Sequence, residues 1–473
     1  MTKPALKPVP DADRFADILR LHAAFAENRP GGIRASLKVH DLSKLNLAGR
    51  NLSGIDLTGA SLCGSDLTGC NLTDAILFAA DFTDAILDGA NLTRANLRGA
   101  TLTRAHIRFA NLSEVDLREG MLIAHRAGSL MPTRASATTS IDGAHLFGSR
   151  LTKARASHAF LGKANMQDAN LSGSNFSGAD LNGANLTGCN MERANFTGAD
   201  LSGVRLEGAI LNHANLTDAN LSDACLLGAL VDDIRIERTD LSRAQRTRTL
   251  DELNLDILTI FQQHQTWVDS NGRDGVRADL SGLDLRDLDL RGLNLGAAVL
   301  SHADLRGANL TGALLMMSDL AVIDGRGANF TNADLRGASL ERAALNGANL
   351  TRAHLAPMHI RGGQRWPVNL RHARLQAARL CGANLSEARL DEADLTGCDL
   401  TGCDLTGTNL TGTNLTGTNL TGTNLSAANL TGTNLTGTMV DGADRTGAIL
   451  TGTEAATVAP RETIPPAGSI GDR

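Results

Sequence analysis

The chain has 473 residues, a formal net charge of −6 at pH 7, no tyrosine and only 3% aromatic residues. A globular core of this size would normally use more aromatic rings, whereas the narrow interior of a repeat solenoid has room only for small and medium side chains. The mild net charge argues against both a basic nucleic-acid-binding surface and an intensely acidic one, so we expect no direct binding of nucleic acid.

Residues 1–32 hold a short N-terminal tail and the first predicted helix. Residues 1–12 lack the apolar core of a signal peptide. No stretch of the chain is apolar for the ~20 residues that a membrane span needs, so we expect a cytoplasmic protein that does not enter a membrane. The residues at helical spacing within 13–29 are Phe15, Ile18, Leu19, His22 and Phe25.

Residues 33–243 repeat with a period of five. One unit with its lead-in, residues 183–187, reads Gly-Ala-Asn-Leu-Thr. If the central Leu is position i, then i−2 is small, i−1 is Asp or Asn, i+1 is polar, and i+2 is often Gly but also Arg, Asp or Glu. This period fits neither an amphipathic helix nor a plain strand. A chain that turns a corner in every unit fits it, with i and i−2 inside and the other positions facing water.

This pattern resembles the pentapeptide repeat family, whose A(D/N)LXX units coil into a right-handed quadrilateral β-helix. The resemblance covers about three quarters of the chain. It implies an all-β solenoid in which four units, about 20 residues, make one coil. Residues 20 apart would then stack about one strand spacing, ~4.8 Å, above each other.

The charges give a check on this coil length that is independent of the resemblance. Opposite charges directly above each other contribute about 0.2–1 kcal/mol per pair, although chance placement of solvated charges is an alternative interpretation. The opposite charges at this spacing are Asp74–Arg94–Glu114, Asp84–Arg104, Asp88–Arg108, Arg374–Asp394 and Arg379–Asp399. A column of like charges breaks the rule but has aspartates beside it: Arg286, Arg306 and Arg326 with Asp284, Asp304 and Asp324.

Residues 123–140 interrupt the first solenoid. The central residues before this segment stand at positions ending in 2 and 7, and those after it at positions ending in 1 and 6. The frame therefore shifts here, and we expect a loop that projects from a rigid scaffold. Function concentrates on such loops.

Residues 244–275 are predicted to form a linker and a second helix, which repeats the first at an offset of 242 residues. Thr249 with Glu252 forms a capping box that predicts where this helix starts. Both helices lead into similar segments, 32–37 and 275–280. The corresponding helix residues are Ile257, Ile260, Phe261, His264 and Trp267.

Both helices are predicted to cap a solenoid. The first coil of a solenoid exposes an apolar end and unpaired backbone groups, and repeat proteins need terminal caps for solubility. We expect Phe25 and Trp267 to anchor these caps, although recognition of a partner by the helices is an alternative. His22 and His264 are interpreted as packed or half-exposed helix residues, and not as catalytic bases.

Residues 276–453 are predicted to form the second solenoid, interrupted at 356–368. The interruption contains Arg361, Arg365 and Trp366, residue types that are enriched at binding hot spots, so they are candidate partner-binding residues. An inert insertion is the alternative. Residues 454–473 are rich in proline and are predicted to form a disordered tail.

The sequence contains no Gly-rich phosphate loop, nucleophile elbow or pair of histidines at metal-ligand spacing. We expect no catalytic, cofactor-binding or metal-binding residue. The predicted function is a non-enzymatic structural or protein-interaction scaffold with a protein partner. The identity of the partner and the oligomeric state of this protein stay open. The family resemblance offers two alternatives: a DNA-mimicking modulator of DNA gyrase, which the arginine column opposes, and a bacterial effector.

Overall fold

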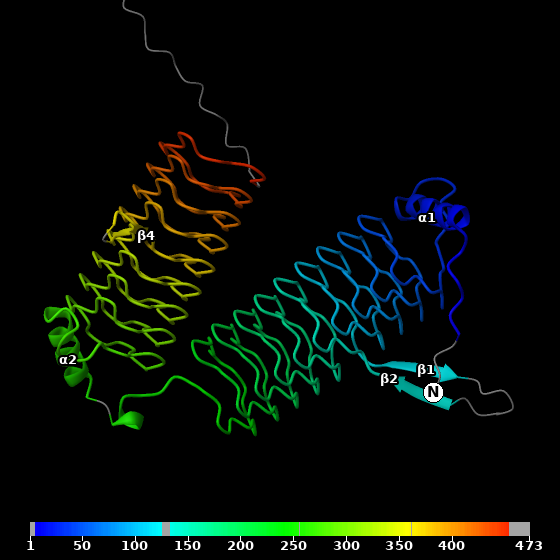
Figure 1. Ribbon diagram of the computed structural model, residues 1–473, viewed down its shortest axis with the longest axis horizontal. Coiled ribbons are helices and arrows are strands. Elements are labelled where there is room, and N and C mark those ends of the chain that lie inside the picture. The colour runs from blue at the N-terminus through cyan, green and yellow to red at the C-terminus, as the bar shows by residue number, and fades with distance from the viewer. Residues whose placement is uncertain (1–4, 125–132, 255, 361, 454–473) are drawn as a thin grey trace, which may run out of the picture. The chain divides into compact units, whose positions relative to one another are not determined.

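A computed structural model provides the coordinates of the chain. The residues that it describes are 5–124, 133–254, 256–360 and 362–453. The chain divides into two compact units, Met1–Thr247 and Arg248–Arg473, and each is treated by itself. Within each unit the backbone winds into a stack of coils, with few regular helices and strands (Figure 1).

The regular elements are two helices, one 3₁₀ turn and two pairs of short strands. In unit 1 they are α1 (Ala12–Ala26), β1 (Gly120–Ala124) and β2 (Thr133–Ala137). In unit 2 they are η1 (Asp251–Leu253), α2 (Ile257–Asp269), β3 (Met358–His359) and β4 (Arg365–Trp366).

Each five-residue unit turns one corner of the coil. At a representative corner the N–H of Ala60 donates to the carbonyl of Leu57 at 3.0 Å, and Gly59 between them has a φ of 64°. This bond and the positive φ at the third residue are those of a type II turn. Positive φ recurs at position i+2 in both units, so glycine is frequent there because it adopts this conformation without steric cost.

Successive coils pair through parallel β-bridges between residues 20 apart. Asn51 pairs with Asn71, Asn71 with Asn91, and Asn91 with Asn111. Four such columns run along each solenoid, one on each face, which confirms four units per coil. Each pairing is an isolated bridge between two corners, and this is why a β-solenoid contains so little continuous strand.

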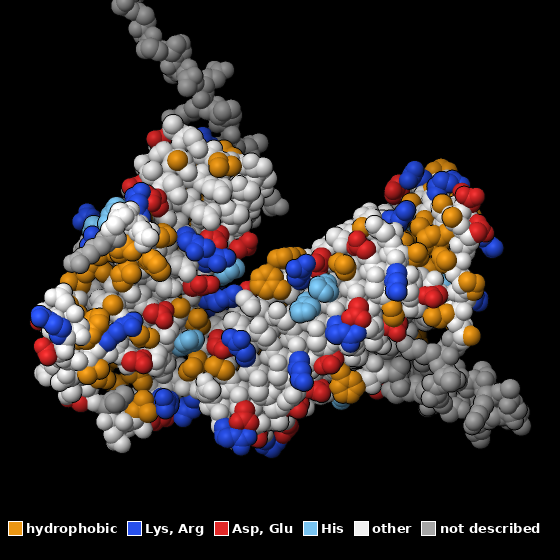
Figure 2. Space-filling model, viewed as in Figure 1, with side chains coloured by type: hydrophobic (Ala, Val, Ile, Leu, Met, Phe, Trp, Pro, Cys, Tyr) orange, Lys and Arg blue, Asp and Glu red, His pale blue; other side chains and the backbone are white. Residues whose placement is uncertain are grey.

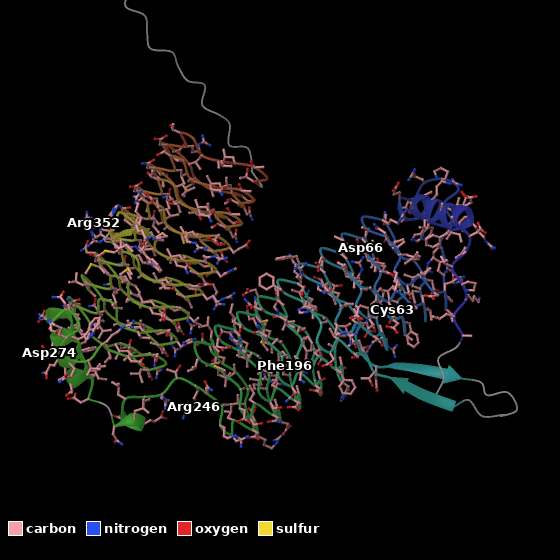
Figure 3. All side chains as sticks on the ribbon, viewed as in Figure 1. Cys63, Asp66, Phe196, Arg246, Asp274 and Arg352 are labelled. Carbon is pink, nitrogen blue, oxygen red and sulfur yellow. The ribbon has the colours of Figure 1, made fainter. Side chains whose placement is uncertain are left out.

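The interior of the coils consists of the residues at i and i−2. Ala184 and Leu186 are both fully buried, for example. The aromatic rings of Phe176 and Phe196 stack inside unit 1 with their centroids 5.3 Å apart (Figure 3 labels Phe196). Cysteines replace alanine at i−2, and the thiol of Cys70 donates to the carbonyl of Leu47. The predicted burial of i and i−2 is confirmed.

The prediction that position i−1 always faces water is wrong at three aspartates. Each of them is less than 9% exposed because a basic side chain from the same five-residue unit or from the neighbouring coil covers its carboxylate. The three pairs are Asp56 with Lys38 at 2.9 Å, Asp116 with Arg118 at 2.8 Å, and Asp324 with Arg326 at 2.7 Å.

The charge columns of unit 1 form ion pairs between successive coils. Arg94 donates to both carboxylate oxygens of Asp74, at 2.8 and 2.7 Å, and Arg104 binds Asp84 with the same distances. In unit 2 the predicted stacking of Arg374 on Asp394 and of Arg379 on Asp399 is present as β-bridges. There the two carboxylates accept hydrogen bonds from Gln376 and Cys381.

Helix α2 begins later than the capping box predicts. The box itself forms, since the N–H of Thr249 donates to Glu252 at 3.3 Å and the N–H of Glu252 donates to Thr249 at 3.2 Å. However, it leads only into η1, which ends at Asn254 in a left-handed conformation with a φ of 50°. The N-cap of α2 is Asp256, whose carboxylate accepts the N–H of Leu258 at 3.1 Å. The predicted helix start is therefore wrong, because a left-handed residue ends the turn first.

Both interruptions of the repeat contain antiparallel hairpins. In unit 1, β1 pairs with β2, and the coil register resumes with Thr101 opposite Ser140. In unit 2, β3 pairs with β4, and the register resumes with Ser339 opposite Asn369. The stacking of the coils thus continues across both interruptions.

Candidate functional site

The β3–β4 hairpin replaces one corner of the second solenoid. Met358 lies opposite Trp366, and His359 lies opposite Arg365. The Trp366 side chain is 54% exposed, which is unusual for a large aromatic residue. Arg361, the third residue predicted to bind a partner, lies outside the described residues.

The Trp366 indole packs against an earlier corner of the solenoid. A methyl group added to Gly337 would lie 3.4 Å from Cδ1 of Trp366, 2.8 Å from Cβ of Met358 and 2.7 Å from Sδ of Met317. These side chains therefore lie directly over Gly337. The absence of a side chain at this corner allows the hairpin to fold back on the coil.

Arg365 connects the hairpin to the following coil. Its guanidinium lies 2.5 Å from a carboxylate oxygen of Glu387, and the two side chains are 50% and 37% exposed. An exposed pair of this kind contributes little to stability, about 0–1 kcal/mol. Its main effect is to hold the guanidinium toward the following coil.

Apolar residues before the hairpin extend this surface. The run Leu314 to Met317 places Met316 and Met317 at i+1 and i+2, positions that are usually polar, and Leu314 is 37% exposed at i−1. Figure 2 shows apolar side chains on the face of unit 2 that carries the hairpin. Leu314, Met317, Met358, Arg365 and Trp366 are called the hairpin surface below.

The methionines, Gly337 and Glu387 were not predicted as part of this site. The signal for the methionines was present, because two apolar residues in succession at i+1 and i+2 depart from the repeat. Gly337 and Glu387 gave no signal, since glycine and glutamate both occur regularly at i+2.

The two predicted cap anchors lie at the ends of their helices beside histidines. Phe25 is 38% exposed and stacks on His22 with ring centroids 5.8 Å apart. Trp267 stacks on His264 at 5.6 Å. Both histidines are completely buried, in agreement with their interpretation as packed helix residues.

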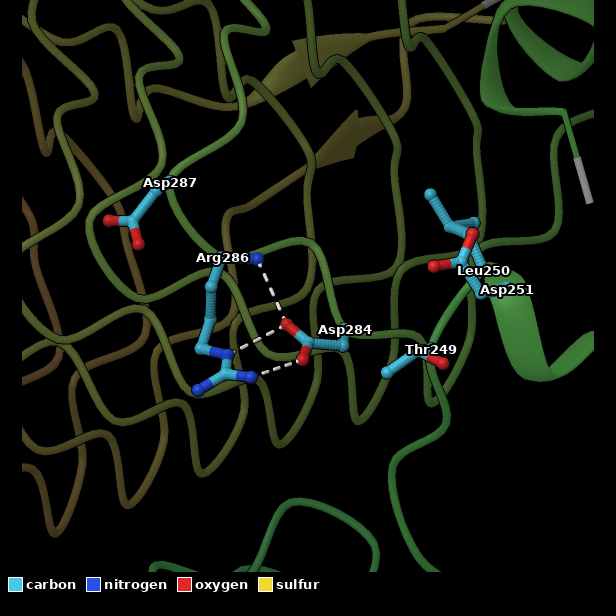
Figure 4. A pocket seen from close by; sticks show the side chains of 6 residues that line it. All are labelled: Thr249, Leu250, Asp251, Asp284, Arg286 and Asp287. Atoms are coloured by element: carbon cyan, nitrogen blue, oxygen red, sulfur yellow. Dashed lines mark hydrogen bonds and ion pairs between the residues drawn. The ribbon is translucent and has the colours of Figure 1, made fainter.

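A shallow groove lies where the linker meets the second solenoid. It is lined by Thr249, Leu250, Asp251, Asp284, Arg286 and Asp287 (Figure 4). Arg286 donates to both oxygens of Asp284, and these bonds raise the pKa of the guanidinium. Because Arg286 is bound in this way, the groove offers no unpaired cation to an anionic ligand.

The arginine column of unit 2 forms a ladder of ion pairs. Each arginine binds the aspartate two residues before it, and Arg286 and Arg306 also approach the aspartate of the next coil. Arg286 lies 2.5 Å from Asp284 and 3.6 Å from Asp304, and Arg306 lies 2.6 Å from Asp304 and 3.4 Å from Asp324. The predicted balance of charge on this face is confirmed.

The described residues offer neither a metal site nor a membrane-spanning helix. Within the described part of the chain, no group of three or more His, Cys, Asp or Glu residues could hold a metal ion. None of the described helices is long and apolar enough to cross a membrane.

The fold and the surface together define a class, the β-helical solenoid repeat proteins. A family model described as "Pentapeptide repeats (8 copies)" matches more than half of the chain, and the chain belongs to the pentapeptide repeat family. We therefore expect both solenoids to have the right-handed coil of this family. The matched residues are 41–77, 80–118, 149–188, 174–212, 189–228, 199–243, 278–315, 326–356, 369–407 and 408–444.

The chain is also similar to solved pentapeptide repeat structures, whereas no curated protein matches it. HetL, involved in heterocyst differentiation regulation in the cyanobacterium Nostoc sp. strain PCC 7120, shares 22% identity over 74% of this chain and 87% of its own, with a TM-score of 0.23. QnrB1, a plasmid-mediated fluoroquinolone resistance protein, shares 22% over 49% of this chain and 98% of its own, with a TM-score of 0.31. At these TM-scores the likenesses carry no inference about function.

Proposed function

We propose that the protein is a non-enzymatic scaffold that binds a partner protein on the hairpin surface. The observation that carries this proposal is the exposure of Trp366, held over Gly337 by the packing of Met317 and Met358. A large aromatic ring that is ordered before binding loses little entropy when a partner covers it. Tryptophan and arginine are enriched at the energetic centres of protein interfaces.

The chemistry of the surface specifies the kind of partner. Methionine side chains adapt to the shape of an apolar ligand and make favourable contacts with aromatic rings. The partner segment is therefore apolar at its centre. Arg365, already oriented by Glu387, would meet a carboxylate or carbonyl group at the edge of that segment.

The two helices are proposed to cap the two solenoids, in modules of residues 1–243 and 244–453. Leu19 of α1 lies in the core cluster of unit 1, which supports this role. The residues of α1 and α2 that pack against the two cores are Phe15 and Ile18 in α1, and Ile257, Ile260 and Phe261 in α2. In α1, Leu19 and His22 contribute the buried contacts, and Phe25 covers the edge of the junction between helix and coil.

The surface of unit 2 supports the DNA-mimicking alternative less than it supports the scaffold proposal. A DNA mimic needs a continuous acidic face. The ladder that begins at Arg286 and ends at Arg326 instead alternates positive and negative groups along its face.

The scaffold proposal is tested by removing the hairpin while the coil is restored. Deletion of residues 357–366 together with Pro367→Gly would leave Leu355 and Leu370 five positions apart, with a glycine at the corner between them. The Pro367 change is needed because proline cannot adopt a positive φ. Because this variant keeps every core residue, it is expected to fold as an unbroken solenoid.

The variant and the wild-type protein would be immobilised and compared in capture experiments from extracts of the native cell. We expect a partner that the wild-type protein captures and the restored-coil variant does not. Circular dichroism and hydrogen exchange of the coils serve as the folding control. Identical capture by a folded variant would overturn the proposal.

A further inference from the structure

The two helix–coil junctions are built from the same polar contacts. Nδ1 of His22 in α1 accepts the N–H of Ala35 at 3.1 Å. Nδ1 of His264 in α2 accepts the N–H of Ala278 at 3.0 Å. Neither imidazole has any exposed surface. Each helix is therefore joined to the first coil of its solenoid by a buried histidine.

An arginine accompanies each histidine. Nε of Arg34 donates to the carbonyl of Gly54 at 2.6 Å, and Nε of Arg277 donates to the carbonyl of Ala297 at 2.5 Å. Both carbonyls belong to the corner one coil further along. The arginines are thus fixed next to the N–H groups that the histidines accept.

At each junction the backbone passes close to the helix at a glycine that stands two residues before the arginine. A methyl group on Gly32 would lie 2.2 Å from the backbone nitrogen of Phe25, and one on Gly275 would lie 2.3 Å from the carbonyl oxygen of Gln263. The N–H of Val276 also donates to Gln263, at 3.1 Å. This tight approach fixes the distance between helix and coil at each junction.

The hydrogen bond to Nδ1 determines the protonation state of each imidazole. A nitrogen that accepts a hydrogen bond carries no proton, so both rings are neutral with the proton on Nε2. Protonation of Nδ1 would place a donor against the donor N–H of the coil. It would also create a positive charge in a buried position beside an arginine.

The surroundings of both rings oppose that charge. Burial lowers the pKa of His22 and of His264 below the usual 6.5, and Arg34 and Arg277 lower these pKa values further. Among the described residues, these arginines are the charged groups that act on the two rings. The Leu52 carbonyl near His22 and the Gly296 carbonyl near His264 act in the opposite direction. Neither Nε2 closes a hydrogen bond.

We propose that His22 and His264 are acid-sensitive latches, and that protonation releases α1 and α2 from the coils that they cover. Release uncovers the apolar end of each solenoid and the unpaired backbone groups of its first coil. Such an edge binds other β-strands readily. The protein would therefore gain a second, acid-dependent binding surface in addition to the hairpin surface.

The direction of the pH effect follows from the proton balance. Each histidine binds a proton more weakly when its helix is latched than when it is released, where its pKa returns to about 6.5. The latched state is therefore fully stable above this pH. It loses stability as the pH falls below 6.5 and continues to do so down to the lowered pKa. The opening equilibrium rises by up to roughly tenfold per pH unit for each histidine.

The test uses asparagine at both positions, in the double variant His22→Asn and His264→Asn. The side-chain oxygen of asparagine can take the place of Nδ1 as an acceptor but cannot be protonated. Hydrogen exchange of α1 and α2, corrected for intrinsic exchange, would be measured between pH 7.5 and 5. His359→Asn, which changes an exposed histidine in β3, is the matched control.

In the wild-type protein and the His359 control, we expect helix opening to increase roughly tenfold between pH 7 and 5. In the double variant, opening should not depend on pH. A pH-independent wild type, or equal pH dependence in wild type and double variant, would overturn the proposal.

Histidine NMR titration of the wild-type protein keeps the proposal testable if the double variant does not fold. The proposal requires His22 and His264 to titrate below pH 6.5, together with the rise in helix exchange. Titration at the usual pH, with the helices still protected, would also overturn it.

Discussion

Two regions of the second solenoid obey different rules, the uniform run 401–438 and the hairpin within 356–368. In the run, the side chains at i, i−2 and i−1 make contacts that the coil requires. Leu415 is fully buried, the hydroxyl of Thr418 donates to the Leu395 carbonyl at 2.8 Å, and the Asn419 side chain accepts the N–H of Thr421 at 3.1 Å. In the hairpin, Trp366 is more than half exposed and closes no turn.

This difference separates structural constraint from function. The repeat determines residue types wherever it continues, so its regularity carries information about shape alone. Where the chain leaves the coil, the residue types are free of that constraint. This is why we propose binding as the role of the exposed tryptophan over methionines.

The largest expected effect on stability lies in the coil. Leu415→Ala should destabilise the surrounding coils by about 2–5 kcal/mol, because it removes a buried side chain and leaves a cavity. Trp366→Ala should change stability by less than about 1 kcal/mol, since most of the ring is already in water. Hydrogen exchange of the coils measures both. Equal destabilisation by the two substitutions would remove the distinction between the regions.

Two corner glycines allow a second comparison between the uniform run and the hairpin. Gly417 in the run and Gly337 under the hairpin have φ values of 65° and 69°, but a methyl group would meet nothing within 4 Å at Gly417. Gly417→Ala should therefore cost only the conformational term of about 1 kcal/mol. Gly337→Ala should cost about 2–4 kcal/mol, because its methyl group also overlaps Met317 and Met358.

Chemical denaturation gives the two free energies of unfolding, and a change in Trp366 fluorescence should accompany only the Gly337 substitution. Trp267, the second tryptophan, would be replaced by phenylalanine in both backgrounds. A cost at Gly337 no larger than that at Gly417 would contradict the packing of the hairpin on its corner.

A smaller effect is expected from the threonine hydroxyls inside the run. Thr418→Val should lower stability by about 0.5–1 kcal/mol through the loss of one buried hydrogen bond. The cost stays small because the Leu395 carbonyl still accepts the N–H of Cys398 at 3.0 Å. Thermal unfolding of the two proteins measures it. A loss of several kcal/mol would show that the hydroxyls organise the coil.

The cysteines should differ in reactivity with no change in stability. Burial raises the pKa of Cys398 and of Cys403 to about 12, so neither forms the thiolate that alkylating agents require at pH 8. Cys63 is only partly buried and should react first. Mass spectrometry after iodoacetamide treatment would detect the modified residues. Rapid labelling of Cys398 in the folded protein would contradict the closed interior of the coils.

The coil could be predicted from the sequence because its constraints are local. The period of five gives the corners, and the spacing of 20 places Asp74 beneath Arg94. The start of α2 could not be predicted in the same way. A capping box marks the beginning of a turn, but whether the turn continues depends on the conformation at Asn254.

The hairpin surface and the histidine contacts also depend on long-range packing. Met317 and Trp366 meet only because the hairpin folds back across the corner at Gly337. The sequence indicated helical positions for His22, but it could not show that Nδ1 accepts the N–H of Ala35. In both cases the partners come from different elements, so spacing along the chain does not reveal them.

The most direct test of the central proposal is the affinity of the purified partner for three proteins: wild type, Trp366→Ala and Thr421→Ala. The last substitution changes a surface threonine of the uniform run and is the matched control. We expect Trp366→Ala to raise Kd by at least about 30-fold, equivalent to about 2 kcal/mol, and Thr421→Ala to leave it unchanged. Equal affinities of wild type and Trp366→Ala for the partner would contradict the account.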